Sequence, residues 1–201
     1  MRIWTAAAGA AGEMLDQYTS LLNTNEAAVS LGAAFRATCA GIIAKASRIT
    51  LLLDKESGRE TVRAGVYVCA DASTGYVGGL VKSAGYASAL DVRRMLAAAL
   101  LDADHVWGLD AVRLEAGIRV YERPVLWHGR LVTFNHASHR VFVDLGFESA
   151  GGRRQPADDS FEQELIQATC GADGQFESIS MVSTPRTRAA ATRLLAPACP
   201  A

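Results

Sequence analysis

The sequence has few of the features that mark metal-bound, secreted or membrane proteins. Its four cysteines are far apart and none belongs to a CxxC pair, so we expect no metal site. The cysteines are Cys39, Cys69, Cys170 and Cys199. No segment reaches the ~20 apolar residues of a membrane helix, and acidic residues interrupt the first apolar stretch, unlike a signal peptide. We therefore expect a cytoplasmic protein that does not bind a membrane.

The chain also lacks an excess of charge of either sign. Its 20 Lys and Arg residues stand against 21 Asp and Glu residues, and the net charge is -1. Nucleic-acid binding relies on many phosphate contacts by Lys and Arg, so we expect no nucleic-acid partner. Hydrophobic residues make up 50% of the chain and charged residues 20%, which is typical of a folded globular protein. A length of 201 residues suits a single domain, residues 1–201.

The first part of the chain is rich in alanine and has apolar residues at helical spacing. This pattern predicts helices within residues 13–22 and 31–46, before any strand. Two β-rich runs then flank the turn-forming segment DKESGRE, which predicts an antiparallel hairpin of residues 48–54 and 61–69. A third run, GYVGGLVKS, follows a second turn, so we predict a meander of three strands.

After the meander the spacing of apolar residues changes from strand to helix. Ser88 and Asp91 fit a capping box, which predicts a helix beginning at Ser88 and ending at Gly108. The next segment, LDAVRLEAGIRV, is typical of a strand. A strand, a helix and a strand in this order favour a parallel crossover. We therefore predict an α/β (α+β) fold with a mixed, mostly antiparallel central sheet flanked by helices, including two N-terminal helices.

The second half of the chain alternates short strands and helices. Residues 119–134 form either a hairpin or one extended strand with a bend. Asn135 is a suitable N-cap for a helix that ends at Gly146, and a strand follows in FESAGGRR. We predict a helix in ADDSFEQELIQAT, a strand in GQFESISMVS, and a last helix with Thr184 at its cap and Pro185 at its first position.

Two local patterns stand out in this order of elements. Residues 95–116, MLAAALLDADHVWGLDAVRLEA, combine a long helix, a glycine exit and a strand. Asn135 stands eleven positions before the pair Gly146-Phe147, and Ser138 completes an N-x-x-S-x-x-V arrangement. With this order and spacing, the chain resembles the GCN5-related N-acetyltransferase (GNAT) superfamily.

The resemblance covers about residues 48–154, which correspond to the core of the family. It implies that residues 1–46 form a helical part on the acceptor side and that residues 155–201 add a C-terminal strand and helices. It also implies that two neighbouring strands splay apart and that the pantetheine arm of an acyl-CoA lies between them. Acetyl-CoA or another acyl-CoA is then the co-substrate, without a metal.

The resemblance further indicates where the acyl-CoA binds. In the family the pyrophosphate lies at the N-terminus of the central helix, where free N–H groups and the helix dipole favour an anion. This sequence departs from the family at Leu90 and Val92, where glycines are usual, and Asp91 adds a carboxylate. The implied cofactor-binding residues are Leu80, Val81, Lys82, Gly85, Ser88, Arg93 and Asn135.

The resemblance leaves the catalytic groups less complete. Many family members have a tyrosine four residues before the glycine of the Gly-Phe pair, and this chain has Phe142, which cannot donate a proton. Ser138 could instead assist the leaving thiolate through a water, or it is a surface serine near a helix cap. Glu115 could deprotonate the acceptor amine as a general base, or it is a solvated strand residue.

We therefore interpret the chain as an acyl-CoA-dependent N-acyltransferase, most simply an N-acetyltransferase. An unknown amine acceptor would attack the thioester directly in a ternary complex. The missing glycines and the missing tyrosine keep open a catalytically inactive GNAT-like binding or assembly module, and an unrelated α/β domain is a third reading. His136 and His139 are interpreted as surface residues rather than metal ligands. A homodimer is left open.

Overall fold

The computed structural model describes residues 1–24, 37–70, 74–83, 88–108, 113–127, 130–156 and 175–196. Gly85 and the helix predicted within residues 157–169 lie outside the described residues. In chain order the elements are β1 (Arg2–Ala7), η1 (Ala8–Ala10), α1 (Glu13–Thr24), α3 (Cys39–Lys45), β2 (Arg48–Glu56), β3 (Arg59–Ala70), β4 (Thr74–Lys82), α4 (Ala89–Trp107), β5 (Arg113–Trp127), β6 (Arg130–Phe134), α5 (His136–Asp144), β7 (Glu148–Pro156), β8 (Gln175–Val182) and α7 (Pro185–Leu195).

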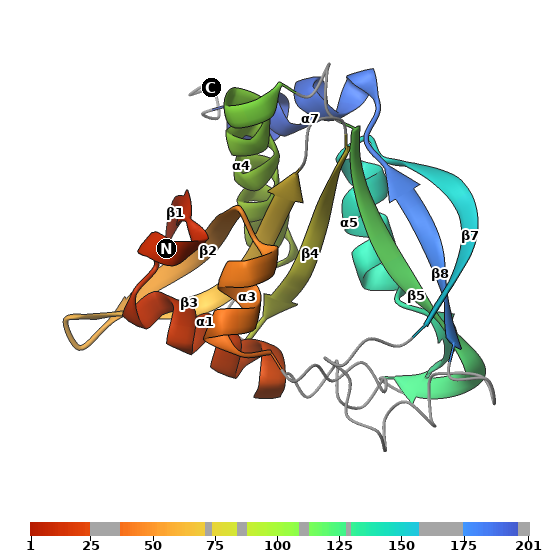
Figure 1. The fold of residues 1–201 in the computed structure, drawn as a ribbon, viewed down its shortest axis with the longest axis horizontal. Coiled ribbons are helices and arrows are strands. Elements are labelled where there is room, and N and C mark those ends of the chain that lie inside the picture. Colours follow the sequence, from red (N-terminus) through yellow and green to blue (C-terminus); the bar gives the residue numbers. More distant parts are fainter. Residues whose placement is uncertain are drawn as a thin grey trace.

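The described strands form one mixed sheet with the order β1-β2-β3-β4-β5-β8-β7, and β6 pairs with β5 off this path. The pairing of β4 with β5 is parallel, and the other strand pairs are antiparallel (Figure 1). The predicted α/β (α+β) class and the mostly antiparallel sheet are therefore confirmed. So is the parallel crossover, because α4 connects β4 to β5.

The meander of β2, β3 and β4 agrees with the prediction from the sequence. β2 and β3 pair antiparallel around a tight turn at Ser57 and Gly58, which have φ angles of 48° and 86°. β4 then pairs antiparallel with β3. The hairpin is longer than predicted, since its strands continue through Glu56 and from Arg59.

The prediction that helices precede any strand is wrong. The chain begins with β1, which pairs antiparallel with β2, with Arg2 opposite Leu53. Ile3, Trp4 and Thr5 are β-branched or aromatic residues of the kind enriched in strands. They pair with the central part of β2, which is mostly apolar. α1 confirms the first predicted helix. The second is shorter than the predicted 31–46, because α3 begins at Cys39 after Thr38, which has an extended backbone and caps the helix, and residues 31–36 lie outside the described ranges. Residues 1–46 therefore contribute a strand to the sheet as well as helices.

α4 begins and ends where its sequence signals predicted. The Ser88 side chain accepts a hydrogen bond from the Asp91 amide, and the Asp91 side chain accepts one from the Ser88 amide, forming a capping box. Gly108 follows the helix with a φ of 75°, which favours glycine. One helical stripe is buried in the core, as the spacing predicted; its residues are Val92, Met95, Leu96, Ala97, Ala99, Leu100 and Ala103.

The second half of the chain also follows the predicted order. β5 and β6 form a hairpin, with Trp127 opposite Arg130, which decides between the two readings of residues 119–134. Asn135 caps α5, whose end is followed by Gly146 with a φ of 79°. β7, β8 and α7 lie where predicted, and α7 has Thr184 at its cap and Pro185 at its first position.

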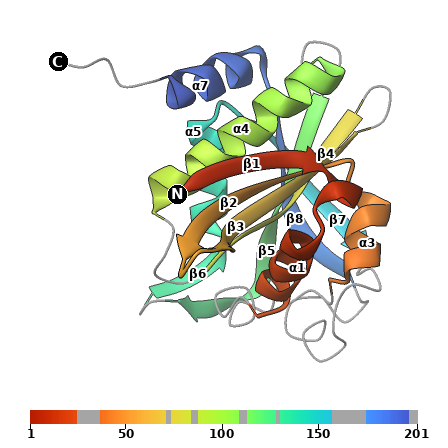
Figure 2. The same cartoon turned by 90° about the vertical axis from the view of Figure 1, so that its left-hand side faces the viewer.

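Helices cover both faces of the sheet and form two separate cores (Figure 2). On one face α4, α5 and α7 pack against the sheet, and the largest fully buried side chains there include Met95, Leu96 and Leu114. On the other face α1 and α3 pack against it around Tyr18, Ile49 and other apolar residues. The direction of a strand side chain thus decides which of the two cores it joins.

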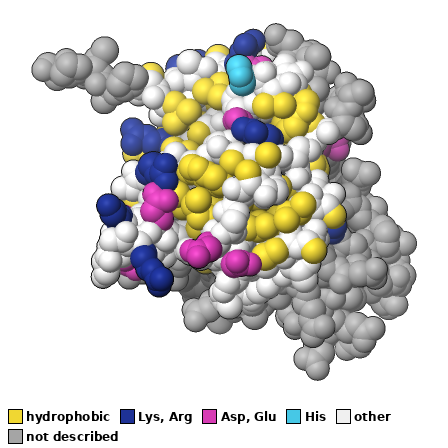
Figure 3. Space-filling view, turned by 60° about the vertical axis from the view of Figure 1, so that its left-hand side comes forward, with side chains coloured by type: hydrophobic (Ala, Val, Ile, Leu, Met, Phe, Trp, Pro, Cys, Tyr) yellow, Lys and Arg dark blue, Asp and Glu magenta, His cyan; other side chains and the backbone are white. Residues whose placement is uncertain are grey.

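Part of the surface is apolar. In Figure 3 hydrophobic side chains gather across the middle of the face that comes forward, with many of the charged side chains toward its edges. Three of the large apolar residues that stay exposed are Met1 at 62%, Ile43 at 47% and Val106 at 45%. Some exposed apolar side chains are ordinary on a protein surface and do not by themselves show a subunit interface. A homodimer therefore stays a prediction.

The turn after α5 is held against α7 at close range. The carbonyl oxygen of Gly146 accepts hydrogen bonds from the hydroxyls of Thr184 at 2.7 Å and Thr187 at 3.2 Å. A Cβ added at Gly146 would lie 3.1 Å from the Thr187 amide nitrogen and 3.2 Å from the Arg186 carbonyl carbon. Both the positive φ and the contact with α7 therefore require glycine at this position.

We expect Gly146→Ala to lower the free energy of unfolding by about 2–3 kcal/mol, because it adds a strained φ and a clash with α7. Gly58→Ala is the matched control, since Gly58 has a φ of 86° with no atom within 4 Å of an added Cβ. Its expected cost is about 1 kcal/mol, from backbone strain alone. Urea denaturation measures both, and equal losses would show that the contact with α7 contributes nothing.

Candidate active site

The central feature of the site is the divergence of β4 and β5. The two strands pair over only three residue pairs, which end at Tyr76 opposite Glu115. From Glu115 onward β5 pairs with β8, whereas the described residues of β4 continue on β3 as far as Lys82. The strands therefore form a V that opens toward the C-terminal end of β4 (Figure 1). Beyond Tyr76, none of the described strands pairs with this edge of β4, whose peptide groups are directed between the two arms of the V.

A β-bulge lies in β4 along the V. Gly65 is opposite Val81 and Tyr67 is opposite Gly78. Two residues of β4, Gly79 and Leu80, therefore lie opposite one residue of β3, the residue between Gly65 and Tyr67. Gly79 has a φ of 61°, as expected for the first residue of a glycine bulge. Such a bulge locally reorients the peptide groups of its strand.

The hydrogen bonds beyond the bulge show which amides face β5. The Ser83 amide donates to the Arg63 carbonyl of β3 at 2.7 Å. Successive peptide groups of a strand point to alternate edges, so the amides of Leu80 and Lys82 lie on the edge away from β3. This is the edge of β4 that faces the V.

The side chains of these three residues have other environments. Val81 is 5% exposed and packs in the core beneath α1, and Leu80 is partly buried against the α4 core. Lys82 is exposed at the end of β4. The backbone of all three predicted residues therefore belongs to the strand that borders the V. Lys82, at the end of that strand, is the one cation among them.

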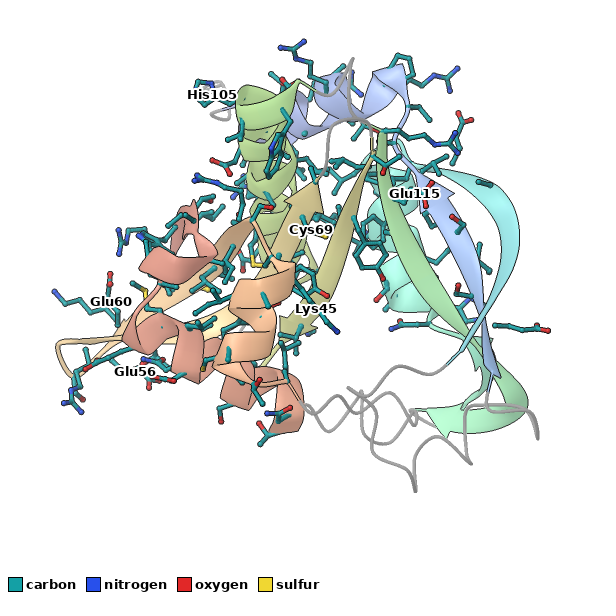
Figure 4. The ribbon with its side chains drawn as sticks, in the orientation of Figure 1. Lys45, Glu56, Glu60, Cys69, His105 and Glu115 are labelled. Atoms are coloured by element: carbon teal, nitrogen blue, oxygen red, sulfur yellow. The ribbon has the colours of Figure 1, made fainter. Side chains whose placement is uncertain are left out.

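Tyr76 and Glu115 lie together on the α1 face of the sheet, where the V begins. Leu114 and Ala116 belong to the α4 core, so alternation along β5 directs Glu115 and Gly117 to the opposite face. Val77 also belongs to the α4 core, which directs its neighbour Tyr76 to the same face as Glu115. Figure 4 shows Glu115 near the end of β5 that pairs with β4.

Tyr76 was not predicted as a site residue. Its side chain is 43% exposed, and its hydroxyl would lie 3.5 Å from a Cβ added at Gly117 of β5. The side chain thus reaches from β4 toward β5 across the start of the V. The residues around Tyr76 in the sequence form no motif that marks it as a site residue. Its position opposite Glu115 follows only from the parallel register of β4 and β5.

Asn135 and Ser138 lie on the other face of the sheet, at the start of α5. The Asn135 Oδ1 atom accepts a hydrogen bond from the Ser138 amide at 3.1 Å, as an N-cap does. Val141 and Phe142 of the same helix are buried in the α4 core. The structure therefore separates the two predicted catalytic residues, because Ser138 belongs to the α4 face and Glu115 points to the α1 face.

Phe142 has a packing role in this chain. It is 3% exposed, and its ring makes an edge contact with Phe147 at a centroid distance of 5.1 Å. The position that carries a tyrosine in many relatives is therefore apolar and buried here. A proton for a leaving group must come from another residue or from water.

The N-terminus of α4 is capped by the chain itself. The Asp91 carboxylate accepts hydrogen bonds from the Ser88 hydroxyl at 2.6 Å and the Ser88 amide at 3.2 Å. The Ser88 hydroxyl oxygen in turn accepts from the Asp91 amide at 3.1 Å. A carboxylate thus lies at the positive end of the helix dipole, where the predicted pyrophosphate would lie.

Arg93, another predicted phosphate ligand, is engaged within the protein. One of its terminal nitrogens lies 2.6 Å from the Asp144 carboxylate, so Arg93 joins α4 to α5. The side chains are 25% and 40% exposed, and the ion pair lies at the surface of the helix contact. Gly85 lies outside the described residues, so the structure does not show whether it supplies the turn.

Within the described ranges, no group of three or more His, Cys, Asp or Glu residues could hold a metal ion. The helices in the same ranges include none long and apolar enough to cross a membrane. A surface depression of about 460 Å³ lies where β5 begins and α7 begins. None of the predicted site residues lines it, although its Val182 lies opposite Glu115 in the sheet. Its lining residues are Arg113, Glu148, Val182, Ser183, Thr184, Pro185 and Arg186.

Comparison with known proteins supports the fold but not a close relationship. No protein-family model matches the sequence, and no curated protein matches it. A ribosomal-protein-S18-alanine N-acetyltransferase from Escherichia coli matches the structure with a TM-score of 0.57 at 12% identity, over 90% of this chain and 93% of that chain. A GCN5-related N-acetyltransferase from Brucella melitensis has a TM-score of 0.56 at 13% identity, over 96% and 83%.

A third solved structure is an aminoglycoside 6'-N-acetyltransferase complexed with coenzyme A. It matches with a TM-score of 0.54 at 10% identity, over 92% of this chain and 97% of that chain. All three similarities span nine-tenths or more of this chain. The chain therefore has the fold of the GCN5-related N-acetyltransferases.

Proposed function

We propose that the chain is an acyl-CoA-dependent N-acyltransferase, and most simply an N-acetyltransferase acting on an amine. The observation that carries this proposal is the V between β4 and β5 with the glycine bulge along one arm. The amides of a pantetheine arm can bond to the free edge of a strand as an added strand would. The similar structure that holds coenzyme A supports the same choice of co-substrate.

The two faces of the sheet support a direct transfer. The amine would approach from the α1 face, where Glu115 accepts a proton from it directly or through a water. The amine nitrogen then attacks the thioester carbon, while the amide of Leu80 donates to the carbonyl oxygen as negative charge develops on it, and the amide of Lys82 lies further along the same strand edge, beside the pantetheine arm. The new C–N bond forms, the C–S bond breaks, and the thiolate leaves with the electron pair of that bond.

The departing thiolate also needs a proton. Phe142 cannot supply one, since its buried ring has no donor. Ser138 lies at the start of α5, on the α4 face of the sheet, and is half-buried. We assign to Ser138 the delivery of this proton through a water, with bulk solvent as the final source.

The fit to acyl-CoA differs between its two ends. The pantetheine end has the free strand edge and the bulge amides described above. At the phosphate end, by contrast, the Asp91 carboxylate caps α4, where the pyrophosphate is expected, and Arg93 is already paired with Asp144. This contrast favours one rival, a GNAT-fold module that binds a partner without catalysis.

Titration of the purified protein with acetyl-CoA tests the proposal first. We expect acetyl-CoA and free CoA both to bind saturably. A long-chain acyl-CoA should bind only if the acyl pocket is deep. Calorimetry measures all three dissociation constants under one condition. An absence of heat with every one of them would overturn the acyltransferase proposal and leave the non-catalytic module as the better account.

A pair of substitutions separates the two roles of Asn135. Asn135→Ala removes the cap and should lower the free energy of unfolding by about 1 kcal/mol. Asn135→Asp keeps an oxygen to accept from the Ser138 amide but replaces the Nδ2 donor by a negative charge. If Asn135 contacts the acyl-CoA, Asn135→Asp weakens acetyl-CoA binding by about tenfold without the stability loss. Unchanged binding by Asn135→Asp would limit this residue to helix capping.

Glu115→Gln tests the general base. We expect the turnover number to fall by about 10²-fold or more, with the dissociation constant of acetyl-CoA unchanged, because the amide cannot accept the proton. Release of CoA thiol across a panel of amines measures the turnover. Glu148→Gln is the matched control, since Glu148 is an exposed carboxylate on β7 outside the V. A turnover that stays at the wild-type level in Glu115→Gln would exclude Glu115 as the base.

A further inference from the structure

Helix α1 is tied to the bulge of β4 by one buried side chain. The hydroxyl of Tyr18 donates a hydrogen bond to the carbonyl oxygen of Gly79 at 2.6 Å. Tyr18 is fully buried, with 0% of its surface exposed. Residues 61 positions apart in the chain are thus joined at the point where β4 bulges along the V.

Glycines on β3 and β4 make room for this contact. A Cβ added at Gly65 would lie 2.4 Å from the Tyr18 ring, and one added at Gly79 would lie 2.3 Å from the Tyr18 hydroxyl. A Cβ added at Gly78 would likewise lie 2.5 Å from the Tyr67 ring. The absence of side chains at these three positions therefore lets two tyrosine rings lie directly on the strands.

The hydrogen bond of Tyr18 fixes a peptide group and not only a side chain. The carbonyl of Gly79 and the amide of Leu80 belong to one planar, trans peptide, so they point in opposite directions. The Tyr18 ring lies against Gly65 of β3, and its hydroxyl therefore reaches the Gly79 carbonyl from the β3 side. The Leu80 amide is consequently held toward the other side, which faces β5 and the V.

The orientation of the Leu80 amide also follows from the Ser83 hydrogen bond, because successive amides of a strand point to alternate edges. The Tyr18 hydrogen bond and the Ser83 hydrogen bond to Arg63 thus independently place the Leu80 amide on the same edge of β4.

Burial raises the pKa of Tyr18 well above its ordinary value, and the neighbouring Tyr67 raises it further. Tyr18 therefore keeps its proton, and remains a donor, throughout the pH range of an enzyme assay.

We propose that Tyr18 is a positioning residue for acyl transfer: its hydroxyl orients the Gly79–Leu80 peptide so that the Leu80 amide polarises the thioester carbonyl. This inference rests on the proposed acyltransferase function. It also gives α1 a part in the chemistry, because the helix that borders the acceptor face holds the peptide that contacts the acyl group.

The test compares two ligands that differ in one oxygen atom. Acetyl-CoA has the thioester carbonyl, whereas S-ethyl-CoA has a methylene group in its place and cannot accept a hydrogen bond there. We expect wild-type protein to bind acetyl-CoA about tenfold more tightly than S-ethyl-CoA. In Tyr18→Phe this ratio should fall close to one, through weaker binding of acetyl-CoA with little change for S-ethyl-CoA.

A spectroscopic readout separates positioning from a general loss of structure. The infrared carbonyl stretch of bound, ¹³C-labelled acetyl-CoA should lie below the value in solution for wild-type protein. It should return toward the solution value in Tyr18→Phe. Thr19→Val is the matched control, because the Thr19 hydroxyl is also buried in α1 but donates to the Leu15 carbonyl of the same helix at 2.7 Å. It should keep the wild-type ratio and stretch.

Two unnatural side chains keep the test decisive if Tyr18→Phe does not fold. 4-Aminophenylalanine at position 18 retains a donor and should preserve the ratio, whereas 4-methylphenylalanine matches its size without a donor and should lose it. An unchanged ratio in the folded variants that lack the donor would overturn the role of Tyr18 alone. A wild-type protein that binds neither ligand would overturn this role together with the acyltransferase proposal.

Discussion

A β-strand has two edges, and β5 pairs with a different strand on each of them. On one edge it pairs with β4 over three residues that end at Glu115, and on the other it pairs with β8 from Glu115 onward, so that β4 and β5 separate in the middle of the sheet. A strand edge without a neighbouring strand presents amides and carbonyls to whatever lies beside it. Within the described residues, the V is therefore a place where an extended ligand can pair with the edge of β4.

The same divergence connects the two faces of the sheet. Glu115 and Tyr76 point to the face covered by α1 and α3, and Asn135 and Ser138 lie at the start of a helix on the face covered by α4. Residues on opposite faces of an intact sheet cannot act on one molecule, but they can do so across the V. An acyl group in the V would be open to an amine from one side and to a proton donor from the other.

The sequence predicted best what local interactions decide. The capping box of Ser88, the Asn135 cap and Gly146 each depend on residues a few positions apart, and all three lie where expected. β1 was missed because an edge strand is defined by its partner, β2, which begins 46 positions later in the chain and meets β1 only through tertiary pairing. Tyr76 and Tyr18 were missed for the same reason, since their significance comes from β5 and from the bulge and not from neighbouring residues.

The departures from the family pattern lie on two helices, at the start of α4 and inside α5. Asp91 closes the start of α4 and Phe142 fills the core, yet the bulge, the V and the tyrosine that holds the bulge are all formed. These two groups of residues lie on different elements and do not depend on each other for their geometry. A chain could therefore keep the means to orient a thioester while changing how it holds the charged end of its carrier.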